Sequence, residues 1–263
     1  MLKIVMPLAE RPYAPSGRSQ FFFPVAVKWL LISNFTIFVI NFLARAYGGE
    51  WIFYPFGLVP EMVVYKGAIW QLVSYMFLHS TLGFMHILFN MLTLWSFGTD
   101  IEYAWGTRKF LKYYFVCGIG AGITVIVAHW IGGDMASRTI GASGAIYGLI
   151  LAFAMIDPER MVMYSFIFPM KAKYMAMLLG GMAFLMTIGD TGGGISHFAH
   201  LGGMLWGYLY LKMNQARKPV RHSKEAGLIE KLQRGYHDWK MERAKRKFQV
   251  YMSKNRDKGP WTN

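Results

Sequence analysis

The stretch TIGASGAIYG, residues 139–148, places three glycines, two alanines and one serine at the head of an apolar run. Gly144, Gly148 and Ala152 recur every four residues, and small residues at this spacing let membrane helices approach closely. Ser143 therefore has two interpretations from these residues alone, a small packing residue or a nucleophile. The choice depends on which polar residues the rest of the chain can bring beside it.

Apolar residues make up 54% of the 263-residue chain, a share that is unusual for a water-soluble protein. A helix needs about 20 apolar residues to cross a hydrocarbon layer about 30 Å thick. Six long runs with almost no charge meet this pattern, at residues 24–46, 82–104, 110–131, 140–156, 174–188 and 196–211. The sequence predicts an all-α integral membrane protein with six transmembrane helices.

Lys and Arg are distributed unevenly over the segments that flank these runs, which predicts the orientation of the chain. They gather before the first run and in the second and fourth loops: Lys3, Arg11, Arg18 and Lys28; Arg108, Lys109 and Lys112; Arg160, Lys171 and Lys173. Because cytoplasmic loops carry the excess of Lys and Arg, both termini are expected in the cytoplasm. We predict a multi-pass plasma-membrane protein in which the second, fourth and sixth helices begin at the outer face.

We expect three regions: a cytoplasmic N-terminal segment at 1–23, a membrane domain at 24–212 and a basic cytoplasmic tail at 213–263. The first 20 residues lack the apolar stretch of a cleavable signal, so the first helix is expected to act as the insertion signal. The tail holds 14 Lys and Arg against 5 Asp and Glu, +9 of the chain's +14. Its apolar positions recur at helical spacing, at Leu228, Leu232, Tyr236 and Trp239. This pattern fits an amphipathic helix on anionic lipid, or a solvated tail that enforces topology. No nucleic-acid partner is expected.

Three polar clusters lie near the outer ends of the even-numbered helices. His86 and Asn90 share a face of the second helix, Ser143 lies between Gly141 and Gly144 at the start of the fourth, and His197 and His200 begin the sixth. Polar groups within a membrane span are costly unless they are paired, so each cluster is a candidate functional site. Each lies about one turn inside its helix, so the clusters can converge at one depth. A hydroxyl, an imidazole and further donors are the groups that acyl transfer requires.

A carboxylate that could complete a triad is missing at this depth. Asp157 lies about 21 Å along the fourth helix from Ser143, and Glu102 lies about 24 Å along the second helix from His86. Asp134 and Asp190 lie in outer loops, outside the helices. The residues therefore favour a Ser–His dyad, with the ring of Tyr147 one turn below Ser143. Either His86 or His200 could be the base. On the sixth helix, Gly203 and Gly207 share a face with His200 and would allow close contact with the fourth helix.

The motifs GASGAIYG, HILFN and AHLGGMLWG, taken together, resemble the rhomboid family of intramembrane serine proteases. The resemblance covers residues 24–212 and includes Glu102 and Trp70. The family pattern in the first loop is usually Trp-Arg, and here it is Trp70-Gln71. This departure concerns the contacts of that loop and not the chemistry.

The resemblance implies a role for each site residue. Ser143 looks like the nucleophile, His200 like the general base that later acts as an acid, and Tyr147 like the ring that packs against its imidazole. The backbone N–H of Ser143 and the side chains of His86 and Asn90 look like the oxyanion hole. The implied substrate is a single-pass membrane protein whose helix unwinds near its outer end, cut after a small residue.

Two loops are expected to help the site. The first, at residues 47–81, is rich in aromatic residues and suits a partly embedded interfacial element. The fifth has three consecutive glycines, Gly192 to Gly194, and suits a flexible cap. His79 in the first loop could point toward the site or toward lipid headgroups.

Other function classes have less support in the sequence. We expect no cofactor and no metal, because His197 and His200 have neither an HExxH motif nor thiolates beside them. A rhomboid-like pseudoprotease would bind membrane helices without cleaving them, but such proteins typically lack the serine or the histidine. A transporter would need polar residues along the whole membrane depth, whereas here they cluster at the outer end.

Overall fold

The computed structural model describes residues 24–164, 168–189, 195–216 and 243. Contacts divide the chain into two units, Met1–Gln215 and Ala216–Asn263. The predicted amphipathic helix of the tail, the segment 1–23 and the glycine-rich fifth loop lie outside the described residues.

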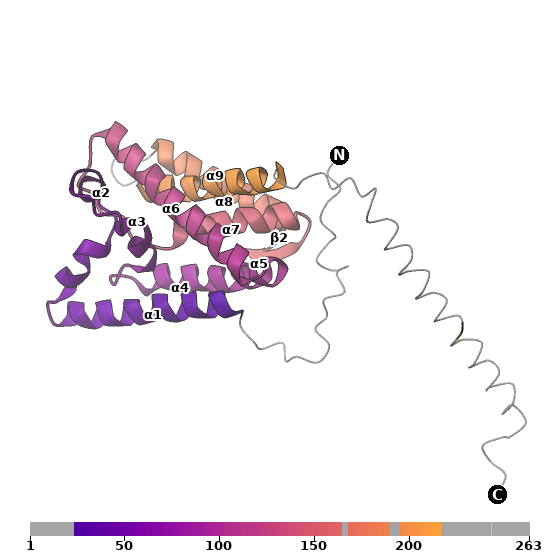
Figure 1. Ribbon diagram of the computed structural model, residues 1–263, viewed down its shortest axis with the longest axis horizontal. Helices are drawn as coiled ribbons and strands as arrows, with labels where there is room; N and C mark the ends of the chain where they lie inside the picture. Colours follow the sequence, from indigo (N-terminus) through magenta and orange to yellow (C-terminus); the bar gives the residue numbers. More distant parts are fainter. Residues whose placement is uncertain (1–23, 165–167, 190–194, 217–242, 244–263) are drawn as a thin grey trace, which may run out of the picture. The chain divides into compact units, whose positions relative to one another are not determined.

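The described fold is almost entirely helical, and each of the six predicted runs falls on a helix (Figure 1). The second run is helical throughout and has a π-helical turn at its centre. The helices are α1 (Val25–Ala46), α4 (Phe84–Thr93) followed by the π-turn η4 (Leu94–Gly98) and α5 (Thr99–Trp105), α6 (Thr107–Gly132), α7 (Ser143–Ile156), α8 (Ala172–Gly189) and α9 (Ile195–Ala216). Figure 1 shows α6 crossing its neighbours obliquely.

Three of these helices, α1, α6 and α8, are long and apolar enough to cross a membrane, and α7 is a shorter apolar helix. The outward faces of α1 and α8 are apolar, with Trp29, Phe35, Phe184 and Leu185 more than half exposed. A water-soluble protein rarely exposes so many large apolar side chains in one region. The chain is a mostly helical, multi-pass membrane protein.

Helix α7 lies at the centre of the unit and packs closely against its neighbours. Its glycines are the contact points: a Cβ on Gly203 of α9 would collide with the carbonyl oxygen of Gly144, and one on Gly148 would collide with Cys117 of α6. A Cβ on Gly207 would lie 3.1 Å from the same Cys117 sulfur. Helices approach this closely only where side chains are absent. The contact brings the start of α7 beside α9.

A buried carboxylate joins α5 to the beginning of α1. The Glu102 oxygens accept hydrogen bonds from the backbone N–H groups of Ala26 and Val27, at 3.0 and 2.9 Å, and from the Thr107 hydroxyl at 2.7 Å. The first N–H groups of a helix have no partner within the helix, and a negative charge there is favourable. Glu102 therefore serves as the N-terminal cap that Pro24, which precedes α1, does not provide.

The first loop folds into short helical segments at the end of the bundle opposite α5 (Figure 1). These segments are η2 (Glu50–Phe56), α2 (Pro60–Lys66), α3 (Gln71–Ser74) and η3 (Tyr75–Phe77). Exposed Trp51, Tyr54, Tyr65 and Trp70 give the loop an amphipathic surface. The amide of buried Gln71 accepts from the N–H of Val59 at 2.9 Å and donates to the carbonyl of Pro55 at 3.1 Å. Gln71 thus makes defined contacts at the position where the family usually has arginine.

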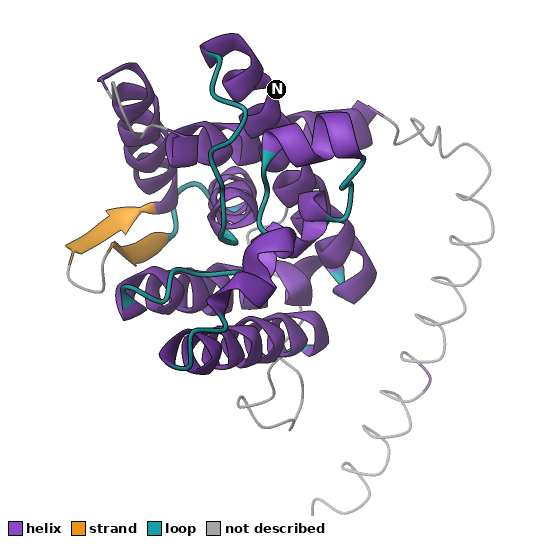
Figure 2. Ribbon diagram, turned by 90° about the vertical axis from the view of Figure 1, so that its left-hand side faces the viewer, coloured by secondary structure: helices purple, strands orange, loops and turns teal. Residues whose placement is uncertain are grey.

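A two-stranded hairpin, which the sequence pattern did not predict, connects α7 to α8 and projects sideways in Figure 2. Strand β1 (Met161–Tyr164) pairs antiparallel with β2 (Phe168–Lys171), and Met161 lies opposite Lys171. Glu159 binds both Lys171 and Lys173, and these hydrogen bonds lower the pKa of Glu159 to about 2. The hairpin places Arg160 and the start of β1 against the helices.

Candidate active site

Ser143 is the first residue of α7, so the prediction that it lies one turn inside its helix was wrong. The predicted helix began at residue 140, three residues too early. Gly141 has φ of +125°, which ends any helical path and which side chains rarely tolerate. Helix α7 can therefore begin only after Gly141, and with Ala142 as its N-cap the serine is its first residue.

The Ser143 hydroxyl lies beside the imidazole of His200. The distance from Ser143 Oγ to His200 Nε2 is 2.9 Å, although the two residues are 57 positions apart. The ring of Tyr147 stacks on the His200 ring, with centroids 4.1 Å apart and planes 2° from parallel. The stacking fixes the plane of the imidazole, so Nε2 is aimed at the serine. This hydrogen bond is the geometry that a nucleophile and its base require.

The other imidazole nitrogen, His200 Nδ1, is buried, and no described residue forms a hydrogen bond with it. In a full triad a carboxylate occupies this position. Among the described residues, aromatic stacking thus replaces the carboxylate as the group that orients the histidine. The ring of His197 lies 5.9 Å from His200, and the described residues contain no cluster of three His, Cys, Asp or Glu that could hold a metal.

His86 and Asn90 lie on α4, across from the start of α7. The His86 ring faces Gly141 so closely that a Cβ there would lie 3.2 Å from its Cε1 and Nε2, and 3.8 Å from Ser143 Oγ. The Asn90 amide donates to the backbone carbonyl of His86 at 2.8 Å. Both side chains line the cavity that contains Ser143 and His200. Gly141 thus leaves the space in which His86 can approach the serine.

The backbone N–H of Ser143 belongs to the first turn of α7. N–H groups in this turn have no acceptor within the helix and carry the positive end of the helix dipole. An anion that forms beside Ser143 Oγ would therefore meet a backbone donor, with His86 and Asn90 on the opposite wall of the cavity. This arrangement can stabilise an oxyanion.

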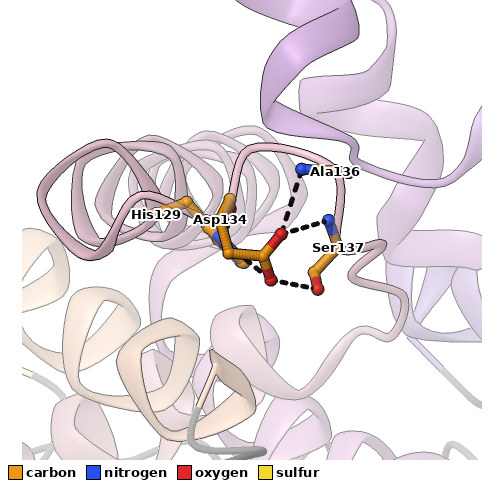
Figure 3. Close-up of polar contacts among 4 residues, drawn as sticks. All are labelled: His129, Asp134, Ala136 and Ser137. Atoms are coloured by element: carbon orange, nitrogen blue, oxygen red, sulfur yellow. Dashed lines mark hydrogen bonds and ion pairs between the residues drawn. The ribbon is translucent and has the colours of Figure 1, made fainter.

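The loop between α6 and α7 holds Ser143 through contacts that the sequence did not reveal. The Asp134 carboxylate accepts from the backbone N–H groups of Ala136 and Ser137, both at 3.2 Å, and from the Ser137 hydroxyl (Figure 3). The bond from the Ser137 hydroxyl is the main cause of the lowered pKa of Asp134. The sequence presented Asp134 only as a carboxylate in an outer loop, whereas it organises this turn. The backbone of Asp134 also contacts His129, a side chain of α6.

The first loop contacts residues 138–141, the segment that directly precedes Ser143. Leu58 and Thr139 exchange two backbone hydrogen bonds at 2.9 and 2.8 Å, and the Gly141 N–H donates to the Tyr75 carbonyl at 2.9 Å. The Arg138 guanidinium donates to the Phe53 carbonyl at 2.8 Å and lies over the Tyr54 ring. The backbone at Gly141 is therefore fixed by a loop about 70 residues earlier in the chain.

His79, whose direction the sequence left open, lies next to the site. It is 1% exposed, and its ring centroid is 5.2 Å from that of His86. Burial and the neighbouring His86 lower the pKa of this first-loop side chain to about 4. His79 is thus a neutral neighbour of the His86 ring at neutral pH.

A cavity of about 800 Å³ begins at these residues and extends between α4–α5 on one side and α7, α8 and β1 on the other. Ser143, His200, His86, Asn90 and Tyr147 line one part of it. Asp100 and Arg160 line another part, and their place there was not predicted from the sequence. Asp100 follows His86 by 14 residues, about four helical turns, and this register is the signal that could have identified it.

Comparison with known proteins gives one family. Residues 66–215, more than half of the chain, match the Rhomboid domain. The chain is 29% identical over 153 residues to Rhomboid protease GluP of Bacillus subtilis, and the aligned residues cover 58% of this chain and 27% of GluP. It is 30% identical over 152 residues to RHOMBOID-like protein 1 of Arabidopsis thaliana, 57% of this chain and 35% of that protein.

A third relative is matched over most of its length. The chain is 28% identical over 159 residues to the putative rhomboid protease YdcA of Bacillus subtilis, 60% of this chain and 74% of YdcA. The matched part thus spans about a third or less of the first two relatives and about three quarters of the third. Because the matched Rhomboid domain covers α3 to α9, the resemblance indicated by the sequence motifs is confirmed, and this chain belongs to the rhomboid family.

Proposed function

We propose that this protein is an intramembrane serine endopeptidase that cleaves membrane-protein substrates with a Ser143–His200 dyad. The observation that carries the proposal is the 2.9 Å hydrogen bond between Ser143 Oγ and His200 Nε2. Its relatives include proteins named as rhomboid proteases, and transmembrane substrates are general in this family. Cleavage by this particular chain is the part that we propose.

The first half of the reaction forms an acyl-enzyme. His200 Nε2 accepts the proton of the Ser143 hydroxyl as Oγ attacks the scissile carbonyl carbon. The negative charge that develops on the carbonyl oxygen is stabilised by the Ser143 N–H and by donors from His86 and Asn90. His200 then gives the proton to the leaving amine, and the C–N bond breaks.

The second half of the reaction uses water. His200 removes a proton from a water molecule as its oxygen attacks the Ser143 ester, and the same charge stabilisation applies to the second tetrahedral intermediate. The proton returns to Ser143 Oγ as the acyl bond breaks. The cavity beside Ser143 gives water a route to a peptide bond that would otherwise be surrounded by lipid.

The topology belongs to the same proposal. The six helical runs are compatible with six crossings of the membrane. The distribution of Lys and Arg favours an orientation with both termini in the cytoplasm. With this orientation the site opens to the outer side of the plasma membrane. A single-pass substrate would have to unwind near its outer end, because a helix shields its carbonyl carbons from attack.

The test is reconstitution in proteoliposomes with a single-pass reporter substrate. Wild-type protein is expected to cut the reporter and to be labelled by a serine-directed fluorophosphonate. Ser143→Ala should lose both activities, whereas Ser33→Ala, which removes a hydroxyl from α1 away from the cavity lining, should still be labelled. Labelling that persists in Ser143→Ala would contradict the nucleophile assignment. A folded wild-type protein that binds the reporter without cutting it would indicate a pseudoprotease.

A further inference from the structure

The cavity continues well beyond the dyad, along two helix faces that run side by side. On α4, η4 and α5 the lining includes a series of residues that recurs every three or four positions: His86, Asn90, Thr93, Phe97 and Asp100. On α7 they are Ser143, Tyr147, Ile150 and Phe153, followed by Arg160. Fourteen residues separate His86 from Asp100, which is about 21 Å at helical rise. A polypeptide bound at Ser143 can therefore extend along the cavity for most of the thickness of a membrane.

An ion pair lies at the far end of this cavity. Arg160 Nη2 is 2.9 Å from Asp100 Oδ2, and it joins α5 to the turn between α7 and β1. The two side chains are 40% and 32% exposed, so both are accessible to a ligand. The Arg160 guanidinium also lies 5.2 Å from the centroid of the Phe153 ring. Arg160 thus has a second contact that it could keep if Asp100 bound another cation.

The charges around the pair favour a cation as the ligand. Asp157, which follows the last residue of α7, acts electrostatically on Asp100, so the ion pair lies near a second carboxylate. Lys171 and Lys173, the next cations along the hairpin, are both paired with Glu159. The two carboxylates outnumber the one guanidinium of Arg160, so an additional positive charge beside Asp100 would be attracted.

We propose, on the basis of the proteolytic function above, that Asp100 is a specificity-determining residue that binds a Lys or Arg in the cytoplasmic flank of the substrate's membrane segment. Single-pass segments carry their excess of Lys and Arg at that end. A fully helical substrate would place this cation about 14 residues from the scissile bond. Unwinding of about four residues at the cut, at about 3.3 Å each, shortens the interval to about 10 residues.

The experiment measures kcat/KM in proteoliposomes for reporters that differ at one position. Lys, Gln or Glu is placed in turn at each position from about 8 to 16 residues from the scissile bond, on the side within the membrane. At positions within reach of Asp100, wild-type protein should prefer Lys to Gln by about two- to fivefold, the range of partly exposed ion pairs, and should cut the Glu reporter least.

Three variants assign this preference to its residue. In Asp100→Asn the ratio of Lys to Gln should fall to about one. In Arg160→Gln it should rise, because Asp100 loses its competing cation. Glu61→Gln removes one negative charge from α2, at a residue outside the cavity lining, and it should keep the wild-type ratio. Fluorophosphonate labelling of each variant shows that the Ser143 site is assembled.

The outcomes separate this inference from the proposed function. Cutting that depends on Ser143 but shows a ratio of one at every position would overturn the inference alone. A preference for Lys that survives in Asp100→Asn would equally overturn the assignment to Asp100. If wild-type protein cut none of the reporters, the proposed function would fail and this inference would fail with it.

Discussion

The Ser143 hydroxyl depends on its surroundings for reactivity, because an un-ionised alcohol is a weak nucleophile. In the proposed reaction His200, at 2.9 Å, is the base and the stacked ring of Tyr147 fixes the plane of its imidazole, so the two contacts have separate effects. Among the described residues, neither His86 nor Asn90 forms a hydrogen bond with Ser143 Oγ. These residues would act later, when charge develops on the carbonyl oxygen.

This division of roles predicts unequal losses of activity. His200→Ala should abolish turnover, because no other described base contacts Ser143 Oγ. His86→Ala and Asn90→Ala should each retain activity reduced by about tenfold to a thousandfold, the cost of one oxyanion donor. Single-turnover rates on the reporter measure the difference. A greater loss in His86→Ala than in His200→Ala would mean that the two histidines exchange roles.

At the scale of elements, the contact between α7 and α9 depends on glycine. Gly203→Ala would place a Cβ against the Gly144 carbonyl, and because backbone cannot move aside easily, we expect a loss of at least about 1–3 kcal/mol in the free energy of unfolding. Gly181→Ala in α8 is the matched control, since its Cβ meets nothing within 4 Å. Thermal unfolding in detergent should separate the two variants, and equal stability would show that α9 can shift without cost.

The α6–α7 loop should respond to pH through Asp134. Its pKa is lowered in the folded state, so the stabilisation from the hydrogen bonds to Ala136 and Ser137 is fully present above the ordinary pKa of a carboxyl and is lost as pH falls through the lowered pKa. Hydrogen exchange of residues 133–142 should be severalfold faster in Asp134→Ala than in wild type at about pH 6. The two proteins should converge once the pH lies below the lowered pKa of Asp134. Identical exchange at pH 6 would show that the carboxylate does not hold this loop.

At the scale of the whole molecule, the long helices are connected by a few buried polar contacts. Glu102 holds α1 against α5 and α6, and it does so with three hydrogen bonds in a region from which water is excluded. The contact between Leu58 and Thr139 similarly connects the first loop to the loop that precedes Ser143. Apolar packing between helices differs little from packing against lipid, so such polar contacts help to specify one arrangement of the helices.

Removal of the Glu102 carboxylate should therefore affect the whole fold. Glu102→Ala leaves two N–H groups of α1 and the Thr107 hydroxyl without their acceptor, and we expect a loss of about 2–3 kcal/mol. Glu102→Gln keeps one acceptor oxygen and should lose less. Thermal unfolding of both variants in one detergent measures the order. A Gln variant as unstable as the Ala variant would mean that the charge, and not the number of acceptors, is decisive.

The sequence by itself determined the class of protein, the helical runs and the family, because these depend on composition, on apolar run length and on motifs within single helices. It could not determine that α7 begins at Ser143, because that boundary depends on the backbone at Gly141, which Tyr75 and Leu58 hold from a distant loop. The hairpin and the pairing of Asp100 with Arg160 were also decided only by the tertiary structure. Contacts between residues far apart in the chain leave no local pattern, since each partner alone looks like an ordinary loop or helix residue.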